Sequence, residues 1–198
     1  MKLAFAKAAA SDEGGREPLF FFLFATMELS TAVLLIRDGV DDVPSQSWVD
    51  LGAGKGMFTN ALSTVLKSGN IVAVDKDSGA LKAIKISNPA VQLELMTGEF
   101  LSLKFEMANL DGILMANAIH YVKDKVALFN KLIPALKKSG RIILVEYDMD
   151  ASNPYVPYPV SFSTLEQIAE EVGFSSCVRL ASAPSVYQRA GMYSALLR

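Results

Sequence analysis

From residue 47 to residue 145 the apolar positions of the chain alternate between two spacings. Short, mostly apolar runs occur at 48–51, 71–74, 112–116 and 141–145, and the run at 71–74 is continuous. Between them, apolar residues recur every three or four positions, which is typical of helices, whereas continuous runs are expected of strands buried on both faces of a parallel sheet. A further run, 91–95, alternates apolar and polar residues and predicts a strand nearer the sheet edge. The pattern predicts an α/β fold with five strands alternating with helices.

After residue 145 this alternation stops. The segment 147–160 is rich in proline and tyrosine and predicts a loop long enough to be functional. Ser163-x-x-Glu166 has the sequence of a capping box, so we expect a helix to start there and to end at Gly173. Two last apolar runs, 177–181 and 192–197, are too close for a parallel crossover and predict an antiparallel hairpin. Together the elements predict a seven-stranded, mostly parallel sheet with helices on both faces.

The N-terminal part contains an apolar stretch, 19–36, that is nearly long enough to cross a bilayer. Glu28 lies in its middle, Thr31 adds another polar group, and acidic residues precede it where a basic flank would be expected. We therefore prefer a helix that packs on the domain and caps its ligand cleft, and membrane contact is the weaker alternative. This divides a single-domain chain into an N-terminal lead-in and helix, 1–43, and a main part, 44–198.

Composition narrows the class of function. The 198 residues carry a net charge of −2, which provides no basic field for a nucleic-acid backbone. One histidine and one cysteine leave no zinc-site spacing and no intramolecular disulfide, so no metal is expected. We expect a soluble, cytoplasmic protein that acts on a small molecule. Nothing in the sequence indicates its oligomeric state.

The most informative motif is VDLGAGKG, at 49–56, where a predicted strand runs into closely spaced glycines and then a helix. Such a loop lets main-chain N–H groups approach a ligand. Asp75 ends the next strand, 19 positions after Gly56, close to the roughly 20 that place a carboxylate beside ribose hydroxyls. The motif and the acid together predict a cofactor that contains a nucleoside.

The spacing of the glycines distinguishes between cofactors. A dinucleotide site has the pattern G-x-G-x-x-G, and Met57 stands where its last glycine would fall. The phosphate loop of ATPases requires Ser or Thr after Gly-Lys, but Lys55 is followed by Gly56. The observed Asp-x-Gly-x-Gly-x-Gly resembles the first motif of the class I S-adenosylmethionine-dependent methyltransferases. An NAD-linked oxidoreductase and a cofactor-binding protein without catalytic activity remain alternatives.

The resemblance extends from about residue 47 to the C-terminus. It is carried by VDLGAGKG, by AVDKD, by the turn at 98–100, and by DGILMANAIHY followed by GRIILVEYD. It implies a Rossmann-like fold, S-adenosylmethionine as the cofactor, S-adenosylhomocysteine as its product, and in-line methyl transfer to a small-molecule acceptor. The Asn/Asp-Pro-Pro-Tyr signature of enzymes that methylate bases or glutamine is absent after the fourth predicted strand. Action on nucleic acid is correspondingly disfavoured.

The resemblance implies a set of cofactor-binding residues on the loops after the first four strands. They are Asp50, Gly52, Ala53, Gly54, Gly56, Asp75, Lys76, Glu99, Phe100 and Asn117. Asp75 would accept hydrogen bonds from both ribose hydroxyls, with capping of the helix near residue 78 as its alternative role. Glu99, supported by Phe100, would lie near adenine N6, or would otherwise be a solvent-exposed turn residue. Asp50 would hold the loop or the cofactor's ammonium group.

The acceptor side is predicted from two features. His120, the only histidine, follows the fourth strand on the ligand side of the sheet and is a candidate general base, with a hydrogen-bonded pocket or surface histidine as the alternative. Residues that could shape the acceptor site come from the proline-rich loop and the N-terminal helix. They are Glu28, Thr31, Tyr147, Tyr155 and Tyr158. Tyrosines between prolines can pack an aromatic substrate or attract a cationic one.

Overall fold

The computed structural model describes residues 27–99, 108–185 and 190–198, and its centre is a seven-stranded sheet in the order β3-β2-β1-β4-β5-β7-β6. The strands are β1 (Gln46–Leu51), β2 (Gly69–Asp75), β3 (Val91–Thr97), β4 (Leu110–Ala116), β5 (Leu136–Tyr147), β6 (Cys177–Ala183) and β7 (Met192–Leu197). The first five pair in parallel, and β7 pairs antiparallel with both β5 and β6. The predicted fold class, the edge position of the 91–95 strand and the C-terminal hairpin are confirmed.

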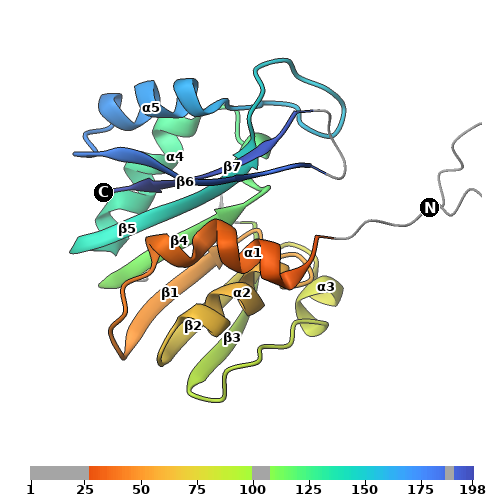
Figure 1. The fold of residues 1–198 in the computed structure, drawn as a ribbon, viewed down its shortest axis with the longest axis vertical. Helices are drawn as coiled ribbons and strands as arrows, with labels where there is room; N and C mark the ends of the chain where they lie inside the picture. The colour runs from red at the N-terminus through yellow and green to blue at the C-terminus, as the bar shows by residue number, and fades with distance from the viewer. Residues whose placement is uncertain (1–26, 100–107, 186–189) are drawn as a thin grey trace, which may run out of the picture.

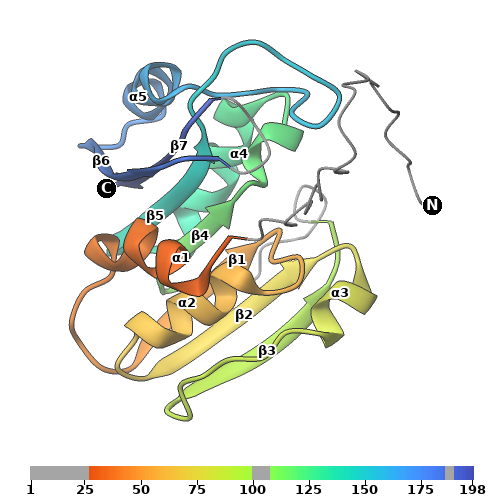
Figure 2. The same ribbon diagram turned by 45° about the vertical axis from the view of Figure 1, so that its right-hand side comes forward.

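Helices cover both faces of the sheet. They are α1 (Leu29–Ile36), α2 (Met57–Val65), α3 (Ser78–Lys82), α4 (Lys125–Leu132) and α5 (Phe162–Glu171). Figures 1 and 2 show α4 and α5 on one side and α1, α2 and α3 on the other. Residues alternate between these layers along each strand: in β5, Ile142 and Leu144 pack with α4 and α5, while Ile143 and Val145 pack with α1 and α2. This alternation produces the continuous apolar runs in the sequence.

The last strand in sequence, β7, lies inside the sheet. It inserts between β5 and β6, and all six of its residues are buried. The outer strand β6 is partly exposed, as expected for an edge. Because β1, β2, β3, β4 and β5 run in parallel, their carboxyl ends lie along one rim of the sheet. Open α/β sheets bind ligands at this rim.

The N-terminal helix is shorter than the predicted one within the described residues. α1 begins at Leu29, after Glu28 at its N-cap, and residues 19–26 lie outside the described part. Its buried side chains, Ala32, Leu35 and Ile36, join the core with α2 and the adjacent sheet face. Among the described helices, none is long and apolar enough to span a membrane.

The predicted start of α5 is wrong by two residues. The N-cap is Ser161, whose hydroxyl accepts the N–H of Thr164 at 3.3 Å, so the helix begins at Phe162 and Ser163 lies within its first turn. The N–H of Phe162 donates to Asp148 at 2.9 Å, a contact from the end of β5 that no local motif shows. The helix ends close to the predicted place, with Gly173 at φ +90° just beyond it.

Candidate cofactor and acceptor site

The glycine loop connects β1 to α2, and three of its residues have the left-handed backbone that favours glycine. φ is +80° at Gly52, +53° at Gly54 and +83° at Gly56. A Cβ on Gly56 would lie 2.5 Å from Ile84, so packing alone requires glycine there. A Cβ on Gly54 would meet nothing within 4 Å. Gly54 therefore leaves an open main-chain surface that a ligand can approach closely.

Three hydrogen bonds hold this loop between its neighbours. The N–H groups of Gly52 and Ala53 both donate to the carbonyl of Val74, at 2.8 and 3.0 Å, which fixes the loop against the end of β2. The carboxylate of Asp50 accepts a hydrogen bond from the Thr59 hydroxyl at 2.6 Å, which connects the end of β1 to the first turns of α2. These hydrogen bonds fix the shape of the loop between β1, β2 and α2.

Asp50 is fully buried, and this changes its acid strength. Removal from water raises the pKa of Asp50 to about 7, the Thr59 hydrogen bond lowers it, and the nearby charge of Asp75 raises it. Among the described carboxyls whose pKa is clearly shifted, Asp50 alone is raised. In the folded protein the carboxyl can thus change its charge near neutral pH.

Asp75 lies beside the glycine loop with both carboxylate oxygens in use. One oxygen accepts the N–H of Gly54 at 2.8 Å, and the other accepts that of Asp77 at 2.9 Å. The N-cap of α3 is Asp77, which accepts from Gly79 and Ala80, so the alternative role of Asp75 as a helix cap is taken by its neighbour. Because a carboxylate offers about four lone pairs, Asp75 can accept two further hydrogen bonds.

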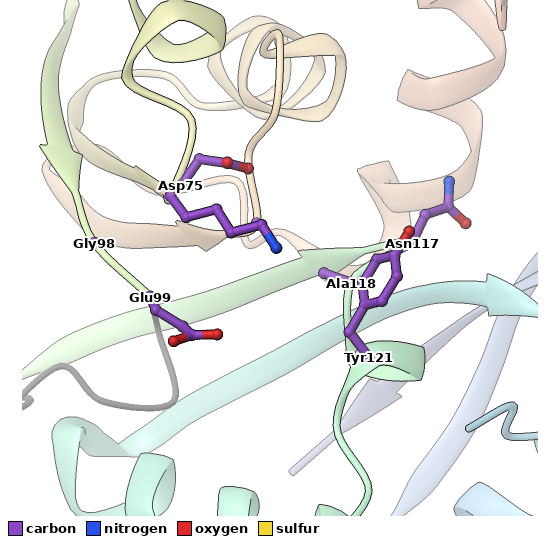
Figure 3. A pocket seen from close by; sticks show the side chains of 8 residues that line it. Asp75, Gly98, Glu99, Asn117, Ala118 and Tyr121 are labelled. Atoms are coloured by element: carbon purple, nitrogen blue, oxygen red, sulfur yellow. The ribbon is translucent and has the colours of Figure 1, made fainter. Parts of the chain in front are cut away.

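A cleft of about 290 Å³ opens over the carboxyl ends of β1, β2, β3 and β4. Its lining includes Gly52, Asp75, Lys76, Gly98, Glu99, Asn117, Ala118 and Tyr121. Figure 3 shows Asp75 and Glu99 on one side, with Tyr121 and Asn117 on the other. The structure therefore brings together predicted residues from four strand ends. Phe100, also predicted here, lies outside the described residues.

Asn117 has two unusual properties at the end of β4. Its φ is +51°, a conformation that few residues other than glycine adopt, while its N–H still donates to Val145 at 2.8 Å. Its Oδ1 atom is buried and has no hydrogen-bond partner within the described parts of the chain. A buried acceptor atom without a donor is unfavourable, so a ligand with an N–H or O–H group would be stabilised here.

His120 lies in the 3-10 turn η2 (Ile119–Tyr121) and forms a buried pair with Glu146 near the end of β5. Its Nδ1 atom is 2.8 and 3.0 Å from the two Glu146 carboxylate oxygens. The side chains of His120 and Glu146 are only 3% and 1% exposed. His120 is not among the described residues that line the cleft, although its neighbours Ala118 and Tyr121 are. The histidine therefore lies directly behind the cleft wall.

The remaining acceptor candidates are only partly brought together. Tyr147 is buried, with its ring centroid 6.0 Å from that of His120, and the N–H of Tyr158 donates to the His120 carbonyl at 3.0 Å. Tyr155 is largely exposed, on the turn that Asn153 forms with Val156. Glu28 and Thr31 are at the start of α1, and no described contact joins them to this group.

Two residues of this region were missed by sequence reasoning. Glu146 interrupts an apolar strand run, and a charged residue within such a run was the available signal. Lys125 is buried, and its Nζ donates to the carbonyls of Val122 at 3.0 Å and Tyr158 at 2.8 Å. Burial lowers the pKa of Lys125, and the charge of Glu146 opposes that change. No local pattern marks a lysine of this kind.

Comparison with known proteins agrees with this geometry. Residues 49–144 match a family model described as a methyltransferase domain. The protein 235L of Invertebrate iridescent virus 6, assigned to the methyltransferases, is 22% identical over 118 residues, covering 59% of this chain and 43% of the viral protein. The demethylmenaquinone methyltransferase of Lactococcus lactis is 25% identical over 120 residues, covering 59% of this chain and 46% of the relative. The chain thus matches less than half the length of either relative.

The fold also matches solved structures. The plantazolicin methyltransferase BpumL, solved in complex with S-adenosylhomocysteine, superposes with a TM-score of 0.61 at 13% identity, over 86% of this chain and 82% of BpumL. Identity at this level supports the fold alone. Together with the methyltransferase-domain match over residues 49–144 and the motif residues gathered at the cleft, it supports the resemblance to the class I S-adenosylmethionine-dependent methyltransferases.

Proposed function

We propose that this protein binds S-adenosylmethionine in the cleft above β1 to β4 and transfers its methyl group to a small-molecule acceptor. The observation that carries the proposal is the pairing of an open glycine backbone at Gly54 with the Asp75 carboxylate, which lies 2.8 Å from the Gly54 N–H. A bare main chain can meet the amino-acid part of the cofactor, and the unused lone pairs of Asp75 can accept ribose hydroxyls. The bound SAH of the neighbour BpumL supports the same cofactor.

The other cleft residues suit this ligand. Glu99 and Lys76 lie at the ends of β3 and β2, where an adenine ring would be reached, and Asp50 lies beneath the glycine loop. Asn117 can offer its Oδ1 atom, which has no partner among the described residues, to a donor on the cofactor or the acceptor. When S-adenosylmethionine is bound, its sulfonium group would supply an activated methyl carbon. The tasks of the protein are then to orient the acceptor in line with that carbon and to exclude water.

A small-molecule acceptor is supported by size and charge. The cleft is about 290 Å³, and the chain carries a net charge of −2, which does not favour a nucleic-acid backbone. The relative from Lactococcus lactis is named for the small molecule demethylmenaquinone. On the acceptor side we propose that His120 acts as a base, and that Tyr147, Tyr155 and Tyr158 shape the site, with Glu28 and Thr31 of the N-terminal helix near its entrance.

Calorimetric titration with S-adenosylhomocysteine tests the cofactor part of the proposal. We expect the parent protein to bind it and the Asp75→Ala variant to lose about 100-fold or more in affinity, because two charge-assisted hydrogen bonds of about 1.5 kcal/mol or more each are removed. An Asp75→Asn variant, which keeps the shape, should lose less. NAD titrated under the same conditions should release no heat of binding.

The matched control is Asp77→Ala, two residues away. This change removes the N-cap of α3, which costs about 1 kcal/mol of stability, but leaves the ribose acceptor in place. Its affinity for S-adenosylhomocysteine should stay near that of the parent. Equal affinity in the parent and in a folded Asp75→Ala variant would contradict the proposed ribose contact.

A further inference from the structure

We infer that the acceptor is an aromatic hydroxyl compound of the phenol type, and that Glu146 positions His120 to accept its proton. The inference rests on the proposed methyl transfer and adds the chemical class of the acceptor. Three observations support it: the geometry of the His120–Glu146 pair, the second ring nitrogen, which has no hydrogen-bond partner among the described residues, and two exposed tyrosines connected to His120.

The pair fixes which ring nitrogen of His120 carries the proton. Besides approaching Nδ1 at 2.8 and 3.0 Å, the Glu146 oxygens accept the main-chain N–H groups of His120 and Tyr147, at 3.4 and 3.2 Å. Each oxygen of Glu146 already accepts a main-chain N–H, so both oxygens act as acceptors toward the ring. Nδ1 therefore holds the proton in the neutral ring, and Nε2 keeps its lone pair.

The basic nitrogen Nε2 remains available. No hydrogen-bond partner for it occurs in the residues that the structure describes, and it is not one of the fully buried unpaired atoms found there, which are Asn117 Oδ1 and Arg141 Nε. His120 is also held from its main chain, because its carbonyl accepts the N–H of Tyr158 at 3.0 Å. A fixed ring with one free basic atom behind the cleft wall suits proton transfer, directly or through one water molecule.

Two exposed tyrosines are connected to His120, one through its ring and one through its main chain. Tyr121 is 58% exposed and its ring centroid lies 4.3 Å from that of His120, while Tyr158, hydrogen-bonded to His120 through its main chain, is 41% exposed. Aromatic rings favour stacked or edge-to-face partners. The Glu146 carboxylate is buried and accepts hydrogen bonds from His120 and Tyr147, so it offers no exposed oxygen to an ammonium group of an acceptor. A neutral aromatic hydroxyl compound fits these surroundings better than a cationic amine.

The proposed step balances as follows for a phenol. The O–H bond breaks and its proton moves to Nε2, so that the ring becomes an imidazolium that Glu146 stabilises. The electron pair of the oxygen forms the new bond to the methyl carbon, and the carbon–sulfur bond breaks with its pair left on sulfur. The sulfonium charge is thereby removed, and the imidazolium later returns its proton to solvent. A phenol is acidic enough for an imidazole to assist, whereas an aliphatic alcohol is a much weaker acid.

Because the chain has a single histidine, nitrogen NMR reads its ring without ambiguity. The experiment uses full-length 15N-labelled protein saturated with S-adenosylhomocysteine. We expect the neutral ring to be protonated on Nδ1 in the parent. This preference should be lost in Glu146→Leu and kept in the control Glu166→Leu, a change at an exposed position of α5. A role of Glu146 in stability alone would lower the unfolding temperature and leave the tautomer unchanged.

The acceptor class is tested by adding two matched probes to the same sample. We expect 2-naphthol to move the Nε2 signal saturably, and 2-methoxynaphthalene, which lacks the O–H group, to leave it in place. Equal effects of both probes, no effect of 2-naphthol, an effect of benzylamine alone, or a ring protonated on Nε2 would each overturn the inference. Failure of the proposed function would be distinct, because S-adenosylhomocysteine would then leave the glycine-loop signals unchanged.

Discussion

Around β1, β2 and α2, which we term the cofactor side, the site is formed mostly by main-chain groups and by one short motif. Around the ends of β4 and β5, the acceptor side, it is formed by side chains with no motif in common. On the first side, main-chain N–H groups of Gly52, Ala53 and Gly54 fix the glycine loop through hydrogen bonds to Val74 and Asp75. On the second side, the His120 ring contacts the Glu146 carboxylate, and the Lys125 side chain donates to the main-chain carbonyl of Tyr158.

The difference matches the chemistry expected of each side. A cofactor that is the same in every turnover can be bound by a fixed backbone cradle, whose shape is preset by glycine conformations and short hydrogen bonds. An acceptor that differs between relatives requires side chains, since these can change without altering the fold. On the cofactor side, stability and cofactor affinity should therefore depend on backbone conformation and on buried groups. On the acceptor side, local structure should depend on individual polar contacts of side chains.

The largest expected effect concerns the buried carboxyl of Asp50 on the cofactor side. Its pKa of about 7 in the folded protein exceeds the ordinary value of 3.8, so the folded state keeps a proton that the unfolded chain releases. This contribution to stability is complete below pH 3.8 and is lost as the pH rises through 7. The free energy of unfolding should fall by up to about 4 kcal/mol between pH 4 and pH 8 because of this group. Urea unfolding at several pH values in that range measures the slope of the free energy of unfolding against pH.

The variant Asp50→Asn isolates this contribution. It keeps an oxygen that can accept from Thr59 but cannot ionise, so the slope should largely disappear and the variant should be more stable than the parent at pH 8. In the control Asp77→Asn, the slope should remain, because asparagine caps α3 about as well as aspartate. A parental slope in Asp50→Asn would mean that another group causes the pH dependence.

The two sides also differ in how far the sequence could predict them. Gly54 and Asp75 belong to one strand-helix-strand unit, whose length places the acid about 20 residues after the loop, so local spacing was enough. The partner of His120 lies 26 residues away on the next parallel strand, and only the register of β4 against β5 brings Glu146 beside it. The two-residue error at the start of α5 has the same origin, since the contact from Asp148 is not local. Tertiary contacts of this kind leave no periodic signal.

Two glycines of the same loop separate packing from ligand binding. Gly56→Ala must adopt φ +83° and places a Cβ 2.5 Å from Ile84, so we expect a loss of about 2 to 4 kcal/mol in the free energy of unfolding. Gly54→Ala meets no neighbour, so its loss should be about 1 to 2 kcal/mol, from the backbone conformation alone. Urea unfolding of both variants measures this difference.

The order of the two variants should reverse for binding. The added methyl group at Gly54 occupies the open backbone surface, so Gly54→Ala should lose more affinity for S-adenosylhomocysteine than Gly56→Ala, once each is compared in its folded form. Calorimetry below the unfolding range of both proteins gives the affinities. If Gly54→Ala binds S-adenosylhomocysteine as tightly as the parent does, the glycine loop is not the binding surface. The contrast between the two sides would then lose its main support.

The smallest expected effect lies on the acceptor side, at Lys125. Its buried ammonium group joins η2 to the proline-rich loop through Val122 and Tyr158, and Lys125→Met removes both contacts while keeping an unbranched apolar stem. The carbonyl of Tyr158 then loses a charged donor, so the loop should open more often, and exchange of the Tyr158 amide hydrogen should be about 10-fold faster. Because this lysine does not line the cleft, affinity for S-adenosylhomocysteine should hardly change.

The control is Lys123→Met, a change at an exposed neighbouring position. It should leave the exchange rate and the affinity at parental values. Faster exchange in both variants, or in neither, would show that the buried lysine does not hold the loop, and that the acceptor side depends less on individual side chains than the contrast requires.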